Sequence, residues 1–307
     1  MKGFLKNTWK NRAHVVLALP AFLLMLFMNY IPMSGLVMAF KKFNYSDGLF
    51  KSPWVGLSNF QVLLTSKATT VTITTNTVKY YFIFTILGTL LNVILAIAID
   101  QCVFKGSAKI MQTIMIIPVF ISYAAVQFIL YAFISTDMGI INRVFLPFFG
   151  IDKEVKFYTS KEMWPTILTV CKMWKDVGYG SVLYMSVLAG IDQELYEAAK
   201  IDGANKWQSI WNITIPMLIP MITVMLLLST GNIFRSDTGL FYILTRNSGL
   251  LYETTQTIDA YVLNSILTMP NFGFTSAITM FQSVVGLLFM LISNFSVRKL
   301  SPENSLF

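Results

Sequence analysis

The apolar residues of this chain are concentrated in six stretches of about twenty residues, each long enough to cross a bilayer as a helix. The pattern predicts an all-α integral membrane protein with six transmembrane helices, over residues 14–40, 78–99, 109–134, 163–190, 213–234 and 275–297. Because no internal repeat or low-complexity tract divides the chain, we expect one transmembrane domain over residues 1–307.

The first apolar stretch begins like a secretory signal peptide, because four basic residues precede or open it: Lys2, Lys6, Lys10 and Arg12. It continues past Pro20 to Phe40 and contains no small-residue cleavage site. We therefore expect a retained membrane anchor.

The distribution of lysine and arginine predicts the orientation of the helices. Segments that a cytoplasmic N-terminus would place inside hold nearly as many basic residues as the outer segments, in about half the total length. Basic residues are thus denser on the inner side, as the positive-inside rule requires. We expect both termini to be cytoplasmic.

The composition agrees with a membrane protein and excludes other classes. Hydrophobic residues make up 55% of the chain and charged residues only 12%, against about 25% charged in a soluble domain. Two cysteines, Cys102 and Cys171, and one histidine, His14, are too few for a disulfide framework or a histidine-based metal site, so we expect no metal. The net charge of +8 comes from dispersed residues, which argues against a nucleic-acid-binding surface.

The segment between the fourth and fifth stretches, residues 191–216, carries the most informative pattern. Asp192 is a good N-cap and acidic residues follow it, which predicts a short helix. Gly203 can adopt the left-handed conformation that ends a helix, and Asn205 can cap a second one. Three apolar side chains on that second helix suit the membrane interface: Trp207, Ile210 and Trp211.

The first of these two helices has a small side. Ala198, Ala199 and Gly203 would let another surface approach the backbone closely, and Glu197 offers a carboxylate to a basic partner. Such a helix fits a groove on another protein. The alternative is an amphipathic connector that lies on the bilayer.

Residues 197–216 resemble the EAA loop of ABC importer permeases. The family pattern is Glu-Ala-Ala, three residues, glycine, nine residues and Ile-x-Leu-Pro. This chain matches it with Glu197-Ala198-Ala199, Gly203 and Ile213-x-Ile215-Pro216. One position departs from the pattern, because Ile215 stands where the family has leucine.

Other positions are similar to the carbohydrate branch of that family, namely Ile116-Ile117-Pro118, Ala189-Gly190, Asp202-Gly203-Ala204 and Pro220. Residues 258–262 and 303–307 are similar to a subgroup that imports oligosaccharides. The resemblance covers most of the chain from residue 80 onward. It implies a type I ABC importer permease in a bacterial plasma membrane, with a cytoplasmic coupling helix and a carbohydrate, in particular an oligosaccharide, as its cargo.

The resemblance also implies that the chain is not an enzyme and that its energy comes from partners. The sequence holds no Gly-x-x-x-x-Gly-Lys-Ser/Thr phosphate loop, in agreement with a permease that carries no cofactor of its own. The implied partners are a second homologous permease, an extracellular solute-binding protein and two ATPase subunits that bind ATP and magnesium. The residues implied to couple to the ATPase are Glu197, Ala198, Ala199, Asp202 and Gly203.

Polar and aromatic side chains at helical spacing near mid-span are candidates for sugar contacts. Tyr123, Gln127 and Tyr131 recur every fourth residue of the third stretch. Gln282 belongs to a polar stripe of the sixth stretch, and Asn92 and Asn232 are lesser candidates. Ordinary packing between helices is the alternative for all of them.

The fourth stretch contains four residues that are unusual within a membrane span: Lys172, Trp174, Lys175 and Asp176. Charges at that depth usually face a bundle interior or water. We assign Trp174, Lys175 and Asp176 to the substrate pathway as candidates. Lys172 and Asp176 are four residues apart, so a structural ion pair is an equal alternative to a sugar contact.

Three other functions compete with a sugar permease. An ABC permease could carry another solute such as glycerol phosphate, but no arginine falls inside the expected spans to bind a phosphate. A self-contained secondary transporter would show inverted repeats, which are not evident. A membrane-bound enzyme would need converging acids, nucleophiles or metal ligands, and the acidic residues lie mostly in loops.

Overall fold

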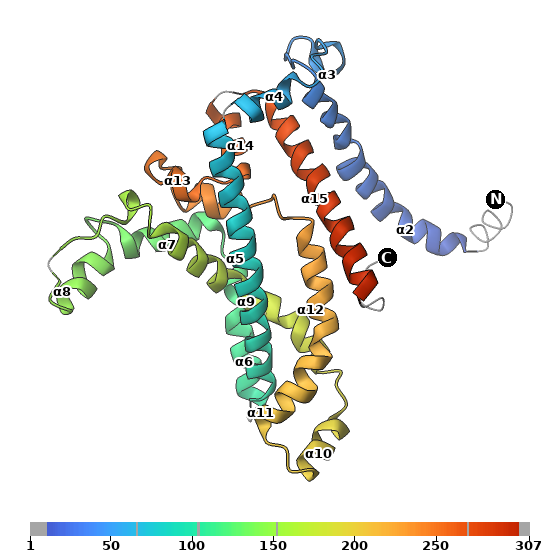
Figure 1. Cartoon of the computed structure of the whole chain (residues 1–307), viewed down its shortest axis with the longest axis vertical. Coiled ribbons are helices and arrows are strands. Elements are labelled where there is room, and N and C mark those ends of the chain that lie inside the picture. Colours follow the sequence, from blue (N-terminus) through green and yellow to red (C-terminus); the bar gives the residue numbers. More distant parts are fainter. Residues whose placement is uncertain (1–10, 66, 103–104, 152, 269, 301–307) are drawn as a thin grey trace. The chain divides into compact units, whose positions relative to one another are not determined.

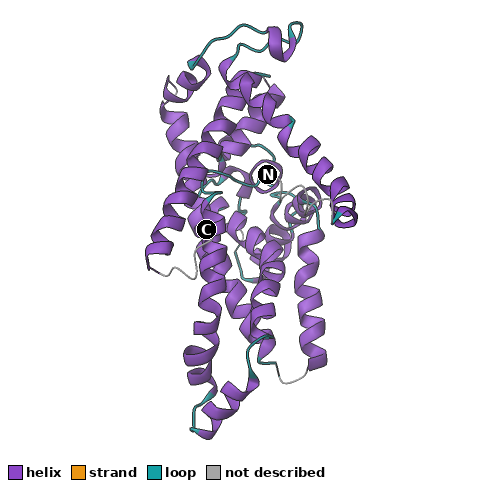
Figure 2. Ribbon diagram, turned by 90° about the vertical axis from the view of Figure 1, so that its right-hand side faces the viewer, coloured by secondary structure: helices purple, strands orange, loops and turns teal. Residues whose placement is uncertain are grey.

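The computed structural model describes residues 11–65, 67–102, 105–151, 153–268 and 270–300. Within these ranges the protein is built from helices and short loops (Figure 2), with one isolated β-bridge between Lys41 and Trp54 and no strand. The all-α class is therefore confirmed. The chain forms two compact units: unit 1 comprises residues 1–66 and 269–281, and unit 2 comprises residues 67–268 and 282–307.

Unit 1 is dominated by one long apolar helical segment. Its elements are α2 (Arg12–Met25), η1 (Leu26–Tyr30), η2 (Pro32–Phe40), α3 (Gly48–Lys51), α4 (Ser58–Thr65) and the first part of α15 (Phe272–Leu300). The side chain of Asn59 donates to the carbonyls of Ala39 at 2.9 Å and Lys41 at 3.0 Å, and so fastens α4 to the end of η2.

Unit 2 contains the other helices and the second part of α15. In chain order they are α5 (Lys67–Asp100), α6 (Lys105–Ile116), η3 (Ile117–Phe120), α7 (Tyr123–Ile134), η4 (Ile141–Phe145), α8 (Leu146–Phe148), η5 (Phe157–Thr159), α9 (Trp164–Leu188), α10 (Gln193–Ile201), α11 (Lys206–Ser209), η6 (Ile210–Thr214), α12 (Ile215–Thr230), η7 (Gly239–Ile243), η8 (Gly249–Leu251), α13 (Tyr252–Thr255) and α14 (Ile258–Thr268).

Helices α5 and α9 run side by side through unit 2, and α12 packs against both (Figure 1). Two apolar clusters hold them together. Toward the start of α5, Tyr80 packs with Trp164 and Leu240. Toward its end, Ala96 packs with Tyr184 and Leu218. The burial of these apolar side chains stabilises the packing of the helices.

Four helical segments among the described residues are long and apolar enough to cross a membrane: Arg12–Phe40, Lys67–Asp100, Lys206–Thr230 and Phe272–Lys299. They correspond to the first, second, fifth and sixth expected spans. A fifth candidate is a bent pair of helices that covers the third. The chain is thus a multi-pass membrane protein by the length and composition of its helices.

The third expected span, residues 109–134, is not one straight helix. It breaks between Gly106–Phe120 and Tyr123–Ile134, whose axes differ by 99°. Pro118 lies at the break and has no N–H to continue the helical ladder. Ser122 is extended, and its hydroxyl accepts a hydrogen bond from Ala125 N to start α7.

The fourth expected span, residues 163–190, forms the 25-residue helix α9, which is not among these apolar candidates. Three charged residues lie near its centre, Lys172, Lys175 and Asp176, and they make it less apolar than the candidate spans. Charges in such a helix need polar partners within the protein. The structure provides those partners inside unit 2.

Candidate functional site

The loop over residues 191–216 folds as its sequence predicts. The Asp192 carboxylate accepts a hydrogen bond from Glu194 N and caps α10. Gly203 ends that helix in the left-handed region, at φ +81°. Asn205 and Gln208 then form a reciprocal capping box that starts α11.

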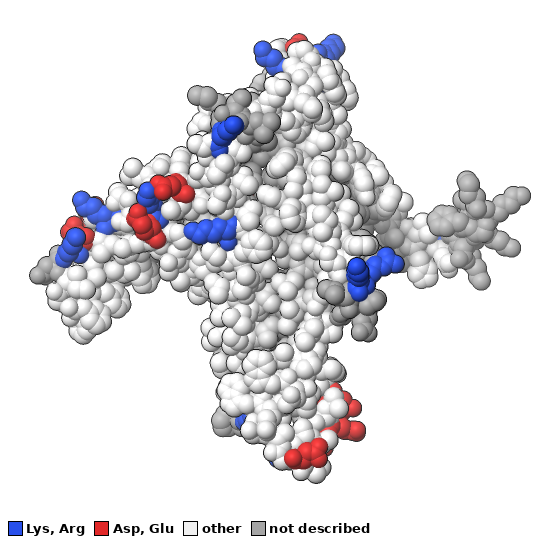
Figure 3. Space-filling view, viewed as in Figure 1, with Lys and Arg blue, Asp and Glu red and all other residues white. Residues whose placement is uncertain are grey.

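Helix α10 presents most of its surface to solvent. It lies beyond the ends of α6 and α12 in unit 2 (Figure 1), where acidic side chains gather in the space-filling view (Figure 3). Glu197, Ala198, Asp202 and Gly203 are exposed, and Ala199 is half-buried. The structure therefore brings all five predicted coupling residues onto one short, exposed and largely acidic element.

A second candidate region lies between α5, α9 and α12. Two adjoining cavities of about 220 and 420 Å³ share four lining residues: Phe84, Thr85, Lys172 and Ser229. The larger volume falls in the range of small-molecule sites, about 300–1,000 Å³. The polar wall on α5 is formed by side chains that recur along one helix face: Thr77, Tyr81, Thr85, Thr89 and Asn92.

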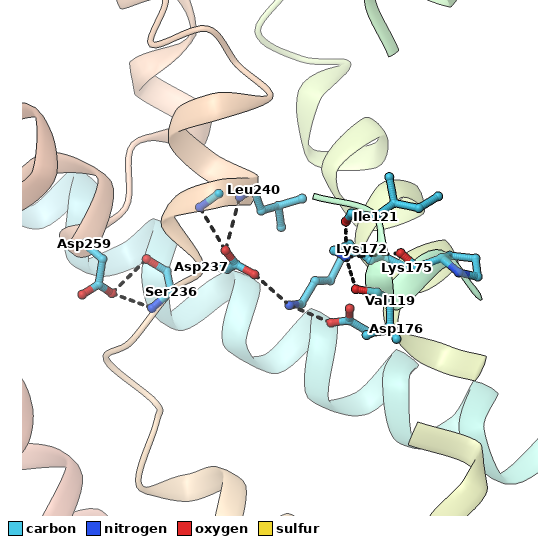
Figure 4. Close-up of polar contacts among 11 residues, drawn as sticks. Val119, Ile121, Lys172, Lys175, Asp176, Ser236, Asp237, Leu240 and Asp259 are labelled. Carbon is cyan, nitrogen blue, oxygen red and sulfur yellow. Dashed lines mark hydrogen bonds and ion pairs between the residues drawn. The ribbon is translucent and has the colours of Figure 1, made fainter. Parts of the chain in front are cut away.

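Lys172 reaches into this space from α9 and contacts two carboxylates (Figure 4). Its Nζ lies 2.7 Å from an oxygen of Asp176 and 3.4 Å from one of Asp237. The other oxygen of Asp237 accepts hydrogen bonds from the backbone N–H groups of Gly239 and Leu240, at the start of η7. The predicted Lys172–Asp176 pair is thus present, and Asp237 extends it to a second element.

Residues 231–238 form a strap that joins α12 to η7, and polar side chains that are buried or half-buried hold it. Asp259 accepts hydrogen bonds from both N and Oγ of Ser236, at 2.5 and 3.0 Å. Gln282 donates to Phe234 O at 2.5 Å and to Asp259 at 3.2 Å. Gln282 is only 3% exposed. This residue, predicted as a sugar contact, therefore stabilises the strap through these hydrogen bonds.

Lys175 is buried, with 7% of its surface exposed. Its ammonium donates to three backbone carbonyls at the bend after α6: Pro118 at 3.2 Å, Val119 at 2.6 Å and Ile121 at 2.6 Å. A positive charge is favourable at the carbonyl end of a helix. Lys175 is absent from the lining of both polar cavities, and its surroundings indicate that it stabilises the bend.

The predicted tyrosine face of α7 packs against protein. The ring of Tyr123 lies 5.2 Å from the Lys175 ammonium and directly against Gly239. Tyr131 contacts the ring of Tyr158 and lies 4.9 Å from the Arg246 guanidinium. The remaining member of this face, Gln127, is half-buried between them on the same helix. Burial raises the pKa of Tyr158 to about 12, against the opposing charge of Arg246, so the phenol is neutral at pH 7.

The remaining sequence candidates divide between two environments. Asn92 lines the smaller cavity, and its Oδ1 is buried without a hydrogen-bond donor among the described residues. Such an acceptor suits a ligand hydroxyl. Asn232 is exposed and lines the larger cavity. Trp174 instead borders an apolar pocket between α5, α6 and α9.

Several cavity residues were not predicted from the sequence. Arg235 and Asp237 follow the expected fifth span directly, and both line the larger cavity. The hydroxyls of Tyr81 and Ser229 lie 3.0 Å apart between α5 and α12. The four-residue spacing of Thr77, Tyr81, Thr85 and Thr89 was the signal in the sequence that would have identified this wall.

This arrangement of helices is shared with known transporters. The chain is 30% identical to a bacterial ABC transporter involved in the import of the acidic polysaccharide alginate, with a TM-score of 0.86 over 97% of this chain and 99% of that one. A second structure of an alginate ABC transporter, in complex with an alginate pentasaccharide-bound periplasmic protein, has a TM-score of 0.85 at 29% identity, over 96% of this chain and 97% of that one.

Curated relatives agree with the structural match. The polygalacturonan/rhamnogalacturonan transport system permease protein YteP of Bacillus subtilis is 27% identical, over 94% of this chain and 88% of that protein. The lactose transport system permease protein LacF of Rhizobium radiobacter is 28% identical, over 66% of this chain and 68% of that protein. The family model described as "binding-protein-dependent transport system inner membrane component" matches residues 88–302. With its polar cavity, its exposed α10 and this match over most of its length, the chain belongs to that family of transport components.

Proposed function

We propose that this chain is one of two membrane permease subunits of an ATP-driven importer that carries an oligosaccharide. A second, homologous permease completes the membrane part, two ATPase subunits bind ATP and magnesium, and an extracellular solute-binding protein delivers the sugar. The chain itself forms one permease domain over residues 1–307 and supplies no catalytic residue and no cofactor. It lies in a bacterial plasma membrane.

The observation that carries the coupling part of this proposal is the exposed α10 loop. Its residues combine a capped short helix, a small-residue face and surface carboxylates, and they match the EAA pattern. The small side chains of Ala198 and Ala199 allow close approach of a partner backbone, and Glu197 and Asp202 suit a basic groove on the ATPase.

In this proposal, closure of the ATPase dimer around ATP moves α10 and thereby rocks the helices joined to it. Such a mechanism requires a helix bundle with two stable arrangements, which the partner biases by binding one of them more tightly. Helix α10 is joined to α9 on one side and, through α11 and η6, to α12 on the other. Both neighbours line the polar cavity.

The membrane topology in the proposal has six spans and cytoplasmic termini. Helix α9 is the fourth span, although it contains charged residues. The bent pair of α6–η3 and α7 is the third span, interrupted at the bend. An irregular backbone at membrane depth is tolerated where protein surrounds it or where it lines a water-filled cavity. The hydrogen bonds from Lys175 to the carbonyls at the bend support this interpretation.

The oligosaccharide part of the proposal rests on the relatives and on the cavity. The relatives carry names that refer to polygalacturonan/rhamnogalacturonan, alginate and lactose. The cavity offers hydroxyls, amides and paired charges beside the rings of Tyr80, Phe84 and Phe241. The hydroxyls of a sugar form hydrogen bonds with such polar groups, and its apolar C–H faces pack on aromatic rings.

The test is ATP-dependent uptake of labelled oligosaccharides by vesicles that contain the complete importer and its binding protein. We expect Glu197→Lys to lower uptake about tenfold, because reversal of the charge at the docking helix removes complementarity worth about 1.4 kcal/mol or more. Glu162→Lys is the matched control, because Glu162 is exposed and distant in sequence from α10. Normal uptake by Glu197→Lys would contradict coupling through α10.

A further inference from the structure

Three cations approach the space between α5, α9 and α12, and the structure gives each a different environment. Lys175 is buried against three carbonyls and lines neither polar cavity. Lys172 lines both cavities but contacts Asp176 and Asp237. Arg235 lines the larger cavity from the strap and is exposed.

Arg235 has no carboxylate partner among the described residues. Its Nη2 donates to Ser283 Oγ at 3.1 Å, and no Asp or Glu oxygen of the described residues lies within 4.0 Å of the guanidinium. A guanidinium carries five N–H donors, so most of this group remains available to the cavity. Its planar fork matches a carboxylate in a bidentate arrangement.

The neighbouring charges direct an anionic group toward Arg235. Two carboxylates surround the single ammonium of Lys172, so the local charge there is negative. A further carboxylate beside Lys172 would be repelled by Asp176 and Asp237. The guanidinium of Arg235 is therefore the positive end of two adjoining cavities, whose linings together contain two cations and two anions.

The groups near Arg235 can bind the rest of a sugar ring. Asn232 is exposed in the same cavity, and the hydroxyls of Tyr81 and Ser229 lie on the opposite helices. The rings of Tyr80 and Phe241, with centroids 4.7 Å apart, form an apolar part of the lining. One charged fork, several neutral hydrogen-bonding groups and an aromatic surface together suit a sugar acid.

We propose that Arg235 binds the carboxylate of a uronic acid residue, and that the saccharide carried through this cavity is anionic. This inference rests on the proposed function, because it names the chemical class of the sugar. It assigns specificity to a residue outside the apolar part of the fifth span. It also assigns Lys172 a different role, namely to hold Asp237 and the strap.

The experiment compares two sugars that differ only in charge, trigalacturonate and its full methyl ester. Uptake of both is measured in vesicles with the complete importer, for the wild type, Arg235→Gln, Arg235→Lys and the control Arg143→Gln. Arg143 is an exposed arginine on η4, outside both cavities. The same binding protein is used throughout, so its own preference cancels in the comparison between variants.

We expect the uptake ratio of trigalacturonate to its methyl ester to fall at least about tenfold in Arg235→Gln, since a charge-assisted bidentate contact is lost. Arg235→Lys should retain part of the ratio, and Arg143→Gln all of it. An unchanged ratio in Arg235→Gln would overturn the inference. Wild-type uptake of the neutral ester alone, with trigalacturonate excluded, would overturn it as well.

A second measurement uses the wild-type complex and needs no variant. Phenylglyoxal modifies accessible arginines, and mass spectrometry then gives the extent of labelling at each site. We expect trigalacturonate, but not its ester, to protect Arg235 severalfold and to leave Arg143 unprotected. Labelling of Arg235 that is equal with and without trigalacturonate would overturn the inference.

The same panel separates a failure of this inference from a failure of the proposed function. If the importer takes up maltotriose and excludes trigalacturonate, the oligosaccharide function stands and the inferred specificity for an anionic sugar is wrong. Uptake of glycerol 3-phosphate with no uptake of any saccharide would overturn the oligosaccharide function and, with it, the role of Arg235 as a uronate-binding residue.

Discussion

Lys175 has its three ammonium hydrogens directed at three backbone carbonyls, from Pro118, Val119 and Ile121. The carbonyl of Pro118 also accepts a hydrogen bond from Ile121 N, whereas those of Val119 and Ile121 lie where the chain bends by 99° and the helical hydrogen bonds are interrupted. Burial of unsatisfied carbonyls is costly, so the lysine and the bend depend on each other. At the scale of single residues, the hydrogen bonds to these carbonyls explain why α9 contains the charged Lys175.

Replacement of Lys175 by methionine keeps the length of the side chain and removes the three donors. We expect Lys175→Met to destabilise the detergent-purified protein by about 1–3 kcal/mol, the cost of buried carbonyls left unpaired. Lys156→Met, at an exposed position, should change stability by less than about 0.5 kcal/mol. Thermal unfolding followed by circular dichroism provides the comparison, and equal melting temperatures for the two variants would refute this role.

Gly203 has φ +81°, and no other atom lies near the position that a Cβ would occupy. A substitution there is therefore penalised by backbone conformation and not by a clash. We expect Gly203→Val to cost about 1–2 kcal/mol locally and to uncouple ATP hydrolysis from uptake, while Gly203→Asn retains most coupling because asparagine tolerates this conformation. Simultaneous ATPase and uptake assays measure the ratio, and equal coupling in the two variants would argue against this explanation.

At the scale of elements, close backbone contacts set how α9 packs. A Cβ on Gly178 would lie 1.7 Å from Met115 O, so α9 touches the backbone of α6 at this point. In contrast, a Cβ on Gly106, within α6, would meet no atom within 4 Å. Glycine at 178 thus allows the two helices to approach, as small residues do between membrane helices.

These two glycines provide a matched pair of substitutions. We expect Gly178→Ala to destabilise the protein by about 1–3 kcal/mol, because the added methyl group forces α6 and α9 apart. Gly106→Ala should be neutral or stabilising by up to about 1 kcal/mol, since alanine favours a helix. Thermal unfolding of both variants tests this. An unchanged melting temperature for Gly178→Ala would show that the close contact is not required.

Local sequence signals predicted the helices and the α10–α11 loop because their causes are local. Asp192, Gly203 and Asn205 act through hydrogen bonds and conformations within a few residues of themselves. The bend after Pro118 and the strap could not be predicted in this way. Their stability depends on Lys175 and Asp259, which are distant in the sequence and reach the backbone only after the helices have packed.

The site was predicted less completely than the fold. Asn92 and Asp176 were identified as polar residues in apolar stretches, and both line the smaller cavity. Gln282 and Tyr123 have the same kind of sequence pattern, yet they pack against the strap and against Gly239. Helical spacing defines a face but not the neighbour of that face, so it could not distinguish a cavity wall from a packed interface.

At the scale of the whole molecule, the proposed function requires this membrane subunit to work within an assembly. In unit 2, short loops connect the exposed helix α10 to α9 and to the α11–η6–α12 segment, and α9 and α12 form walls of a polar cavity. The chain belongs to a family of transport components, and its proposed energy source and sugar delivery both lie on other proteins. Its partners are therefore the most direct test of the account.

The decisive measurement is affinity purification of the tagged chain from gently solubilised native membranes, with mass spectrometry of the proteins recovered. The account predicts a second, homologous permease and a phosphate-loop ATPase in near-equal amounts. Ala198→Trp, which fills the small face of α10, should retain the second permease and lose the ATPase. Recovery of the chain alone or as a homo-oligomer would contradict the account and favour a self-contained carrier.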